Sequence, residues 1–590
     1  MWDDPVRLPR QQRMNTRISP LPIRLHTAIA LALMGAAFIA SALISAATFE
    51  RLPHLEDEFA YLYQAKIFAG RRVWLDRGND PPKYFWQPFM LQEKAPDGDY
   101  QRQYSKYTPG WSLALALGVL VGQPWLINAL LAALNVGLTY RLGREVFDPT
   151  VGVVGALLLA ISPMALLLNA SLMSHTWAMA CTLLFVYGYW RTLPRNSPPS
   201  ESPNARPFAI PVWLFAVMGG LAWGALAATR PLTAVAMALP VAAHMLFRLW
   251  ALRGERTAQG ALLRMGVFMA LGALPTAALY PLYNYATTGD PRTNTYALLW
   301  SYDVIGFGEG IGLNKGGHSL YYGFRNARAD LAAWFRDLYG VVMPPPAADY
   351  LRLTVGWGAG AGLSWLILGM GWWYGRKHEW VWFFTLFLIA LIASGLLYWI
   401  GSVVNGAAAY STRYYYEATF AVCLVSAYGV VTLARTLKIR PLWGRFPIHP
   451  VYLGLWAVCV ASVVFYTPAR LREPLPPDWM NGLWRYNKAG VDQIERLNAM
   501  RGDDPRPVTV IILRSPLPDV RDNWRDYAGL LGVSDPYPEH GAIIVVRVFD
   551  SEEVPAIVQR FSNRLVLYQI GERLYRTMED ALQGAAESGG

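Results

Sequence analysis

The chain has 590 residues, of which 54% are hydrophobic and only 16% are charged. A soluble chain of this length carries far more charge, so the composition indicates a polytopic membrane protein. The formal net charge is +11, but the basic residues are scattered between apolar segments and form no patch with aromatic residues. This pattern favours attraction to membrane lipids and argues against a nucleic-acid partner.

An Arg-rich arm of residues 1–24 precedes the first apolar segment, which covers residues 25–49. This segment is too long for the hydrophobic region of a signal peptide and lacks a clear cleavage site, so we expect a retained anchor. In all, eleven apolar runs have spanning length. They fall near residues 25–49, 123–141, 151–170, 173–190, 211–229, 231–250, 263–284, 350–374, 380–400, 414–436 and 449–467.

Every second connection between these runs is basic. The basic residues are Arg141 and Arg144; Arg191, Arg195 and Arg206; Arg248, Arg253, Arg256 and Arg264; Arg376 and Lys377; and Arg435, Lys438, Arg440 and Arg445. By the positive-inside rule these connections and the N-terminal arm face the cytoplasm, and the C-terminus lies outside a bacterial-type inner (plasma) membrane. A further apolar run at 111–121 is short, and counting it as a span would break the alternation. We therefore expect it to lie in the outer leaflet.

Three large regions then face outward: residues 50–122, residues 286–349 and the tail 468–590. The tail begins with a Pro-rich linker at 473–477 and continues with strand-like runs at 508–513, 542–548 and 564–570. A helical stretch at 554–561 lies between the last two runs. This pattern predicts a small α/β domain outside the membrane, attached to a membrane domain of residues 25–467.

Three consecutive carboxylates, Glu56, Asp57 and Glu58, follow the first span. They open an amphipathic helix that the sequence predicts over residues 57–68. One interpretation is favourable charge at a helix N-terminus. The other is a general base, Asp57, which takes a proton from an acceptor hydroxyl.

Three outward cations, Lys106, Arg230 and Arg413, go against the positive-inside rule and therefore need another explanation. Lys106 lies in a Tyr-Ser-Lys-Tyr-Thr-Pro-Gly stretch, where it either snorkels to the interface or contacts a lipid phosphate. Arg413 opens the span 414–436 beside three tyrosines, and a guanidinium suits a bidentate grip on phosphate oxygens.

Other polar and aromatic residues are also expected on the outer side, close to the ends of spans. They are candidates for the wall of one substrate cavity, and they are Tyr61, Lys83, Tyr107, His175, Arg230, Asn284, His318 and Tyr414. A divalent metal ion bound by Asp57 or Glu58 together with a histidine is an open alternative, and no other cofactor is indicated.

With these residues in place, the chain resembles the GT-C superfamily of polytopic glycosyltransferases. The branch it is most similar to holds protein O-mannosyltransferases (bacterial family 39-like) and lipid A aminoarabinose transferases. Four stretches carry the likeness, at residues 57–65, 105–110, 141–163 and 412–415. Their order and spacing match over most of the membrane region. Where aminoarabinose transferases have an acidic residue before the lysine, this chain has Ser105.

The resemblance implies a GT-C-like catalytic domain over residues 25–467. Such an enzyme transfers a hexose or pentose, with inversion, from a polyprenyl-phosphate donor to a lipid, glycan or protein acceptor on the outer face. By this likeness Asp57 is the base and Glu58 a supporting or metal-binding carboxylate, while Lys106 and Arg413 hold the departing phosphate. A phosphate leaving group requires positive charge of this kind.

Two other classes of function stay open. A lipid or glycan transporter (flippase) would carry charged residues along the membrane interior, whereas the spans of this chain are almost free of ionisable groups. A scaffold that binds partners through its outer domain would not need so many charged and aromatic residues in the loop 50–122. The sequence does not identify the sugar, the acceptor or the length of the prenyl chain.

Overall fold

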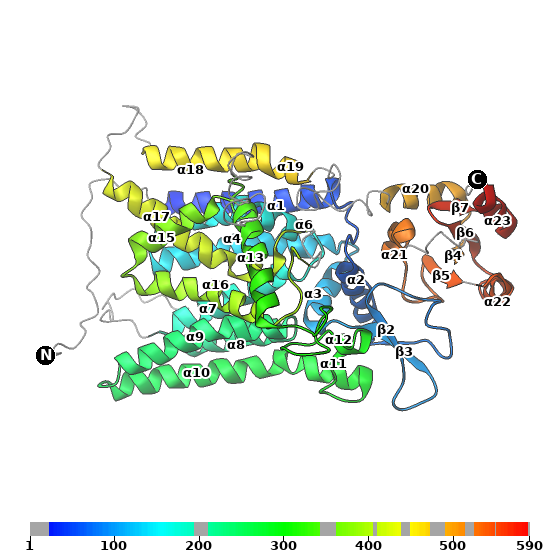
Figure 1. Ribbon diagram of the computed structural model, residues 1–590, viewed down its shortest axis with the longest axis horizontal. Helices are drawn as coiled ribbons and strands as arrows, with labels where there is room; N and C mark the ends of the chain where they lie inside the picture. Colours follow the sequence, from blue (N-terminus) through cyan, green and yellow to red (C-terminus); the bar gives the residue numbers. More distant parts are fainter. Residues whose placement is uncertain are drawn as a thin grey trace.

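The computed structural model describes residues 23–193, 211–342, 362–404, 410–437, 449–471, 490–513, 524–548 and 550–587. These residues form a long bundle of helices and, at one end of the bundle, a smaller domain of strands and helices (Figure 1). Most of the predicted N-terminal arm and the predicted Pro-rich linker 473–477 lie outside the described residues.

The bundle is made of apolar helices that run along its length (Figure 1). They are α1 (Ile23–Ala47), α4 (Trp125–Val146), α5 (Pro149–Ile161), α6 (Pro163–Ala170), α7 (His175–Thr192), α8 (Val212–Ala227), α9 (Pro231–Ala251), α10 (Arg256–Ala277), α15 (Ser364–Gly375), α16 (Glu379–Leu396), α17 (Thr419–Thr436), α18 (Pro450–Ala461) and α19 (Thr467–Leu471). Each predicted apolar run overlaps at least one of them.

The number of spans differs from the prediction. Within the described residues, seven helices are long and apolar enough to cross a membrane, and eight if the bent pair α5–α6 counts as one span. The helix α7 does not meet both criteria. The helix α8 has only 16 residues, and α15 has 12. Residues 343–361, which precede α15, lie outside the described residues. The predicted total of eleven is therefore not established, because an apolar run in the sequence does not fix the length of its helix.

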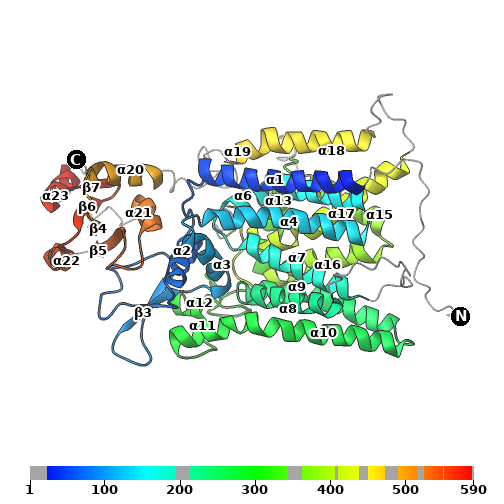
Figure 2. The ribbon, with the colours of Figure 1, turned by 180° about the vertical axis from the view of Figure 1, so that it is seen from behind.

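Different segments of the chain lie at the two ends of the bundle. The connections from α9 to α10 and from α15 to α16 lie at one end, and the strand-containing domain lies at the other (Figures 1 and 2). Basic residues therefore gather at the end far from the C-terminal domain, as their alternation in the sequence predicts. The orientation of the chain in a membrane stays a prediction.

Small residues and a proline shape the bundle. The axes of α5 and α6 differ by 63°, and Pro163 begins the second helix. Helices α8 and α10 pack closely, since a Cβ atom on Gly220 would lie 2.1 Å from the carbonyl oxygen of Met269. A Cβ atom on Gly224 would lie 2.1 Å from that of Ala273. Glycine on one helix thus lets the two backbones approach, as is usual between membrane helices.

Shorter elements lie at the end of the bundle near the C-terminal domain (Figure 2). They are α2 (Glu56–Ala69), β1 (Leu75–Asp76), β2 (Met90–Lys94), β3 (Gln101–Ser105), α3 (Pro109–Leu120), α11 (Leu279–Thr288) and α12 (Thr295–Leu299). The helix α13 (Leu320–Asp337) runs across the middle of the bundle (Figure 1), and the 3-10 helix η1 (Arg413–Ala418) precedes α17. The strands form an antiparallel sheet in the order β1-β3-β2. Helices are thus present where the sequence predicts them at 57–68 and 111–121.

The C-terminal domain is a four-stranded sheet with helices around it (Figure 1). Its elements are α20 (Gly490–Arg501), β4 (Val508–Leu513), η4 (Trp524–Tyr527), α21 (Ala528–Val533), β5 (Ile543–Val548), η5 (Ser551–Glu553), α22 (Val554–Arg560), β6 (Leu565–Ile570), β7 (Arg573–Tyr575) and α23 (Met578–Glu587). The strand order is β5-β4-β6-β7, with β4 parallel to β5 and β6. The three predicted strands and the helix between the last two are all present.

The C-terminal domain is packed on α2 by apolar and polar contacts. Phe59 of α2 belongs to the apolar core of that domain, and its ring meets Trp524 edge to face at 5.4 Å. The ammonium of Lys66 donates to the carbonyl oxygens of Gly532 and Ser534. One short helix therefore contacts both parts of the protein, and Asp57 lies in its first turn.

Candidate functional site

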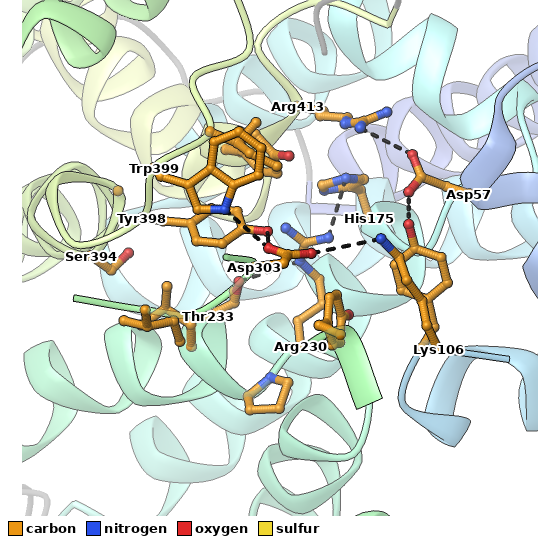
Figure 3. A pocket seen from close by; sticks show the side chains of 18 of the residues that line it. Asp57, Lys106, His175, Arg230, Thr233, Asp303, Ser394, Tyr398, Trp399 and Arg413 are labelled. Atoms are coloured by element: carbon orange, nitrogen blue, oxygen red, sulfur yellow. Dashed lines mark hydrogen bonds and ion pairs between the residues drawn. The ribbon is translucent and has the colours of Figure 1, made fainter. Parts of the chain in front are cut away.

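A cavity of about 910 Å³ lies at the end of the bundle near the C-terminal domain, whose Arg525 belongs to the lining. Figure 3 shows this cavity from close by. Its wall is built by α2, the residues after β3, the N-terminal ends of α7 and α9, the C-terminal end of α16, residues 294–305 and η1. The predicted site residues that line it are Asp57, Tyr61, Lys106, Tyr107, His175, Arg230, Arg413 and Tyr414. Segments far apart in the sequence thus supply one polar surface.

Asp57 is held by two partners from opposite walls (Figure 3). Its Oδ2 lies 3.0 Å from Arg413 Nη2, and its Oδ1 accepts a hydrogen bond from the Tyr107 hydroxyl. Burial by itself would raise the pKa of Asp57, but the Arg413 charge and the Tyr107 hydrogen bond outweigh burial and hold the pKa below its ordinary value. Asp57 is therefore a carboxylate at neutral pH.

Arg413 has donor capacity beyond this ion pair. Its Nη2 pairs with Asp57, while its Nη1 is buried without a hydrogen-bond partner among the described residues. A buried guanidinium nitrogen normally has an acceptor. Because Arg413 lines the cavity, an anionic ligand there could supply the missing oxygen.

Lys106 lies on the other side of Asp57, directly after β3. Its ammonium is 3.7 Å from Asp303 Oδ2, and its side chain is 3% exposed. Four aromatic rings surround it, with centroids at 4.0 to 5.3 Å from the nitrogen, and they are Phe89, Trp300, Tyr107 and Tyr296. Such cation–π contacts stabilise a charged ammonium away from water.

A second group of charges lies between these two cations (Figure 3). Glu417 is fully buried, and its Oε1 lies 3.0 Å from His175 Nδ1 and 3.2 Å from Arg230 Nε. The other imidazole nitrogen, His175 Nε2, is 3.4 Å from Arg230 Nη1. The carboxylate thus orients the histidine and the arginine, both of which face the cavity.

Glu58 does not line the cavity, unlike its neighbour Asp57. Its Oε2 accepts from the backbone N–H groups of His54 and Leu55 and from the Tyr410 hydroxyl, and its Oε1 accepts from the N–H of Leu172. These four bonds fix the start of α2 against the loop after α6. The position suits a structural carboxylate that places Asp57.

The residues around Asp57 and Glu58 do not fit the predicted metal alternative. Both Glu58 oxygens are taken by hydrogen bonds, and Asp57 is paired with Arg413. Across the described residues, no group of three His, Cys, Asp or Glu side chains converges as a metal site would require. The side chains of Asp57 and Glu58 are therefore engaged by protein groups rather than arranged as metal ligands.

Three predicted cavity residues lie elsewhere. Lys83 pairs with Glu553 of the C-terminal domain at 2.8 Å. Asn284 donates to the carbonyl oxygen of Thr293, which ties α11 to the following loop. The His318 Nε2 lies 3.0 Å from the carbonyl oxygen of Leu396. Each of these three side chains contacts protein rather than the cavity.

Sequence reasoning missed Asp303 and Glu417. Asp303 lies in the second outer region, directly after a Trp-Ser-Tyr run, and Glu417 lies four residues after Arg413. For Glu417, the available signal was its place close to the outward Arg413. Asp303 has no basic residue beside it in the sequence, and its partner Lys106 is almost 200 positions away.

Comparison with known proteins gives matches at the level of structure. No protein-family model and no curated protein sequence matches the chain. It is similar to the archaeal oligosaccharyltransferase AglB from Archaeoglobus fulgidus in complex with an inhibitory peptide and a dolichol-phosphate. The TM-score is 0.43 and the sequence identity is 14%, and the match covers 83% of this chain and 62% of that chain. For the apo oligosaccharyltransferase of the same organism, the TM-score is 0.45 and the identity 15% over 85% and 63%.

A further match is ArnT from Cupriavidus metallidurans bound to undecaprenyl phosphate, with a TM-score of 0.42 and 15% identity over 81% of this chain and 72% of that chain. The chain spans less than two thirds of the length of the two oligosaccharyltransferases. With TM-scores below 0.5, the likeness does not extend to individual residues or substrates.

Proposed function

We propose that this chain is a glycosyltransferase that moves a sugar, with inversion, from a polyprenyl-phosphate donor to a hydroxyl of a lipid, glycan or protein acceptor at the outer face of a membrane. One observation carries the proposal: a carboxylate and two cations, Asp57, Lys106 and Arg413, line a single cavity at one end of an apolar helical bundle. The sequence motifs point to the same three residues.

Each of these residues has a defined chemical task. The acceptor oxygen attacks the anomeric carbon of the sugar, the bond from that carbon to the phosphate oxygen breaks, and its electrons stay on the phosphate. The proton of the acceptor hydroxyl passes to Asp57, which acts as the general base. Lys106 and Arg413 stabilise the negative charge that appears on the departing lipid phosphate.

The ion pair between Asp57 and Arg413 suits this sequence of events. Without donor, the guanidinium neutralises the carboxylate and keeps its pKa low. A donor phosphate that takes over Arg413 removes that counter-charge, and the proton affinity of Asp57 then rises. Donor binding would thus make Asp57 a stronger base at the stage when the acceptor hydroxyl can attack the bound donor.

Purified full-length protein can test the proposal with radiolabelled polyprenyl-phosphate sugars and a membrane extract as the source of acceptor. We expect label to move to an acceptor with the wild type, and Asp57→Asn to lower the transfer rate by about 10²–10⁴-fold while the donor still binds. Lys83→Ala is the matched control, because Lys83 pairs with Glu553 away from the cavity and should transfer at the wild-type rate.

Two results would contradict the proposal. Undiminished transfer by Asp57→Asn would remove Asp57 as the base. Movement of intact labelled donor across a vesicle membrane, without transfer of its sugar, would instead support the transporter.

A further inference from the structure

Asp303 lines the cavity but belongs to none of the motifs that point to a glycosyltransferase. It lies between α12 and α13, is 3% exposed and faces Lys106 through Oδ2. The other oxygen, Oδ1, accepts hydrogen bonds from the Tyr398 hydroxyl at 2.9 Å and from Trp399 Nε1 at 3.1 Å. Two donors from the segment after α16 therefore fix the direction of the carboxylate.

The position of Lys106 makes such a carboxylate necessary. Its ammonium is enclosed by aromatic rings, and no hydrogen bond from it to a carbonyl group is present among the described residues that surround it. Transfer of an ammonium out of water is costly unless a negative charge lies nearby. Asp57 is already paired with Arg413, so Asp303 is the carboxylate that faces Lys106.

We propose that Asp303 is a positioning residue of the donor-phosphate site: it supplies the counter-charge of Lys106 and holds the ammonium inside the aromatic enclosure, directed to the cavity. The inference rests on the proposed function, since Lys106 is there the phosphate ligand. Each cation of the donor site then has its own carboxylate, Asp57 for Arg413 and Asp303 for Lys106. A lipid phosphate replaces Asp57 as the partner of Arg413, while Lys106 keeps Asp303 and contacts the phosphate as well.

The charge state of Lys106 gives the proposal a measurable signature. Burial lowers the pKa of Lys106, and Asp303 is the largest of the charges that oppose this effect. The titratable groups that face Lys106 from the neighbouring elements are Asp303, Asp57, Glu56, Tyr107 and Tyr296. Without the Asp303 charge, the ammonium should lose its proton at a lower pH, and phosphate binding should weaken as the pH rises.

The test is binding of undecaprenyl phosphate to purified full-length protein from about pH 6 to about pH 9. Because the lipid phosphate itself titrates near pH 6, the readout is the ratio of the variant Kd to the wild-type Kd at each pH. For Asp303→Asn, which keeps an acceptor for Tyr398 and Trp399, we expect this ratio to rise by at least about tenfold across the range. In Asp303→Asn/Lys106→Arg, the ratio should not change with pH, because a guanidinium stays charged.

A ratio near one at every pH, or a ratio raised equally at every pH, would overturn the proposal, since a purely structural loss has no reason to follow the charge of Lys106. If Asp303→Asn does not fold, Tyr398→Phe removes one bond that orients the carboxylate but keeps its charge. We expect that variant to have a several-fold higher Kd with the wild-type pH profile, and an unchanged Kd would also overturn the proposal.

The same assay separates this inference from the proposed function. If the wild type does not bind undecaprenyl phosphate, or if Arg413→Ala binds as tightly as the wild type, the donor site itself fails. If the wild type binds and Arg413→Ala binds weakly, but Asp303→Asn shows no dependence of the ratio on pH, only the role of Asp303 fails.

Discussion

Glu58→Gln and Asp57→Asn make the same chemical change at neighbouring positions of α2, and the structure assigns them different outcomes. Glu58 is 1% exposed and accepts four hydrogen bonds, three of them from backbone N–H groups. A glutamine has only one acceptor oxygen, so its NH2 group must face a donor. If the amide oxygen keeps the three donors on the Oε2 side, the N–H of Leu172 loses its acceptor.

The cost of Glu58→Gln can be worked from these contacts. A buried donor without an acceptor costs about 1–3 kcal/mol, and each of the three remaining hydrogen bonds weakens by up to about 1 kcal/mol where the wild-type carboxylate is charged. Burial raises the pKa of Glu58 to about 7, so only part of the population carries that charge at neutral pH. Burial of an amide is less costly than burial of a carboxylate, which offsets part of the loss. We expect the free energy of unfolding to fall by about 3 kcal/mol and Tm by about 2 °C, because the unfolding entropy of a 590-residue chain is large.

Thermal unfolding of the purified variants in one detergent, followed by intrinsic tryptophan fluorescence, measures this difference. Asp57→Asn should shift Tm less than Glu58→Gln, because an asparagine keeps an acceptor oxygen for Arg413 and leaves no backbone N–H group without an acceptor. Glu58→Gln with the Tm of the wild type would refute the structural role of Glu58. A larger loss of stability in Asp57→Asn would refute the assignment of roles to the two carboxylates.

Three further predictions concern other parts of the protein. Arg413→Gln removes the charge that lowers the pKa of Asp57, so the acidic limb of kcat/KM, which reports the free enzyme, should move to higher pH; an unmoved limb would contradict this. Gly224→Val should destabilise the packing of α8 on α10 and lower the yield of folded protein, while Gly254→Ala, with open space around it, should behave as the wild type. Phe59→Ala should weaken the packing of the C-terminal domain on α2 by about 3–5 kcal/mol, detectable as faster limited proteolysis of that domain; wild-type resistance would refute the contact.

Much of the fold follows from local patterns in the sequence. The apolar runs, the helix that begins at the acidic cluster and the strands of the C-terminal domain are all visible as contiguous stretches, because hydropathy and periodicity are properties of neighbouring residues. The number of spans was not accessible in this way. For α7 and α15, the extent of the helix depends on polar ends and on packing that an apolar run does not record.

The candidate site was predictable in part. Asp57, Lys106 and Arg413 were identified as outward charges in motifs, and they line one cavity. The different positions of the Asp57 and Glu58 side chains, one in the cavity and one bound by backbone N–H groups, were not predictable in the same way. Both carboxylates lie in the first turn of α2, and only the direction of each side chain separates a cavity residue from one that is bound by backbone donors.

The sequence was enough to predict a helical membrane protein with charged groups collected on one side. The free energy of placing a side chain in a membrane depends on the residue type and on its distance from the nearest apolar run, and both can be read from the sequence. The tertiary structure alone decided which charges meet. Arg413 pairs with Asp57, and Lys106 pairs with Asp303, across long stretches of chain. Such pairs form because helix packing brings their backbones together, and no local pattern contains that information.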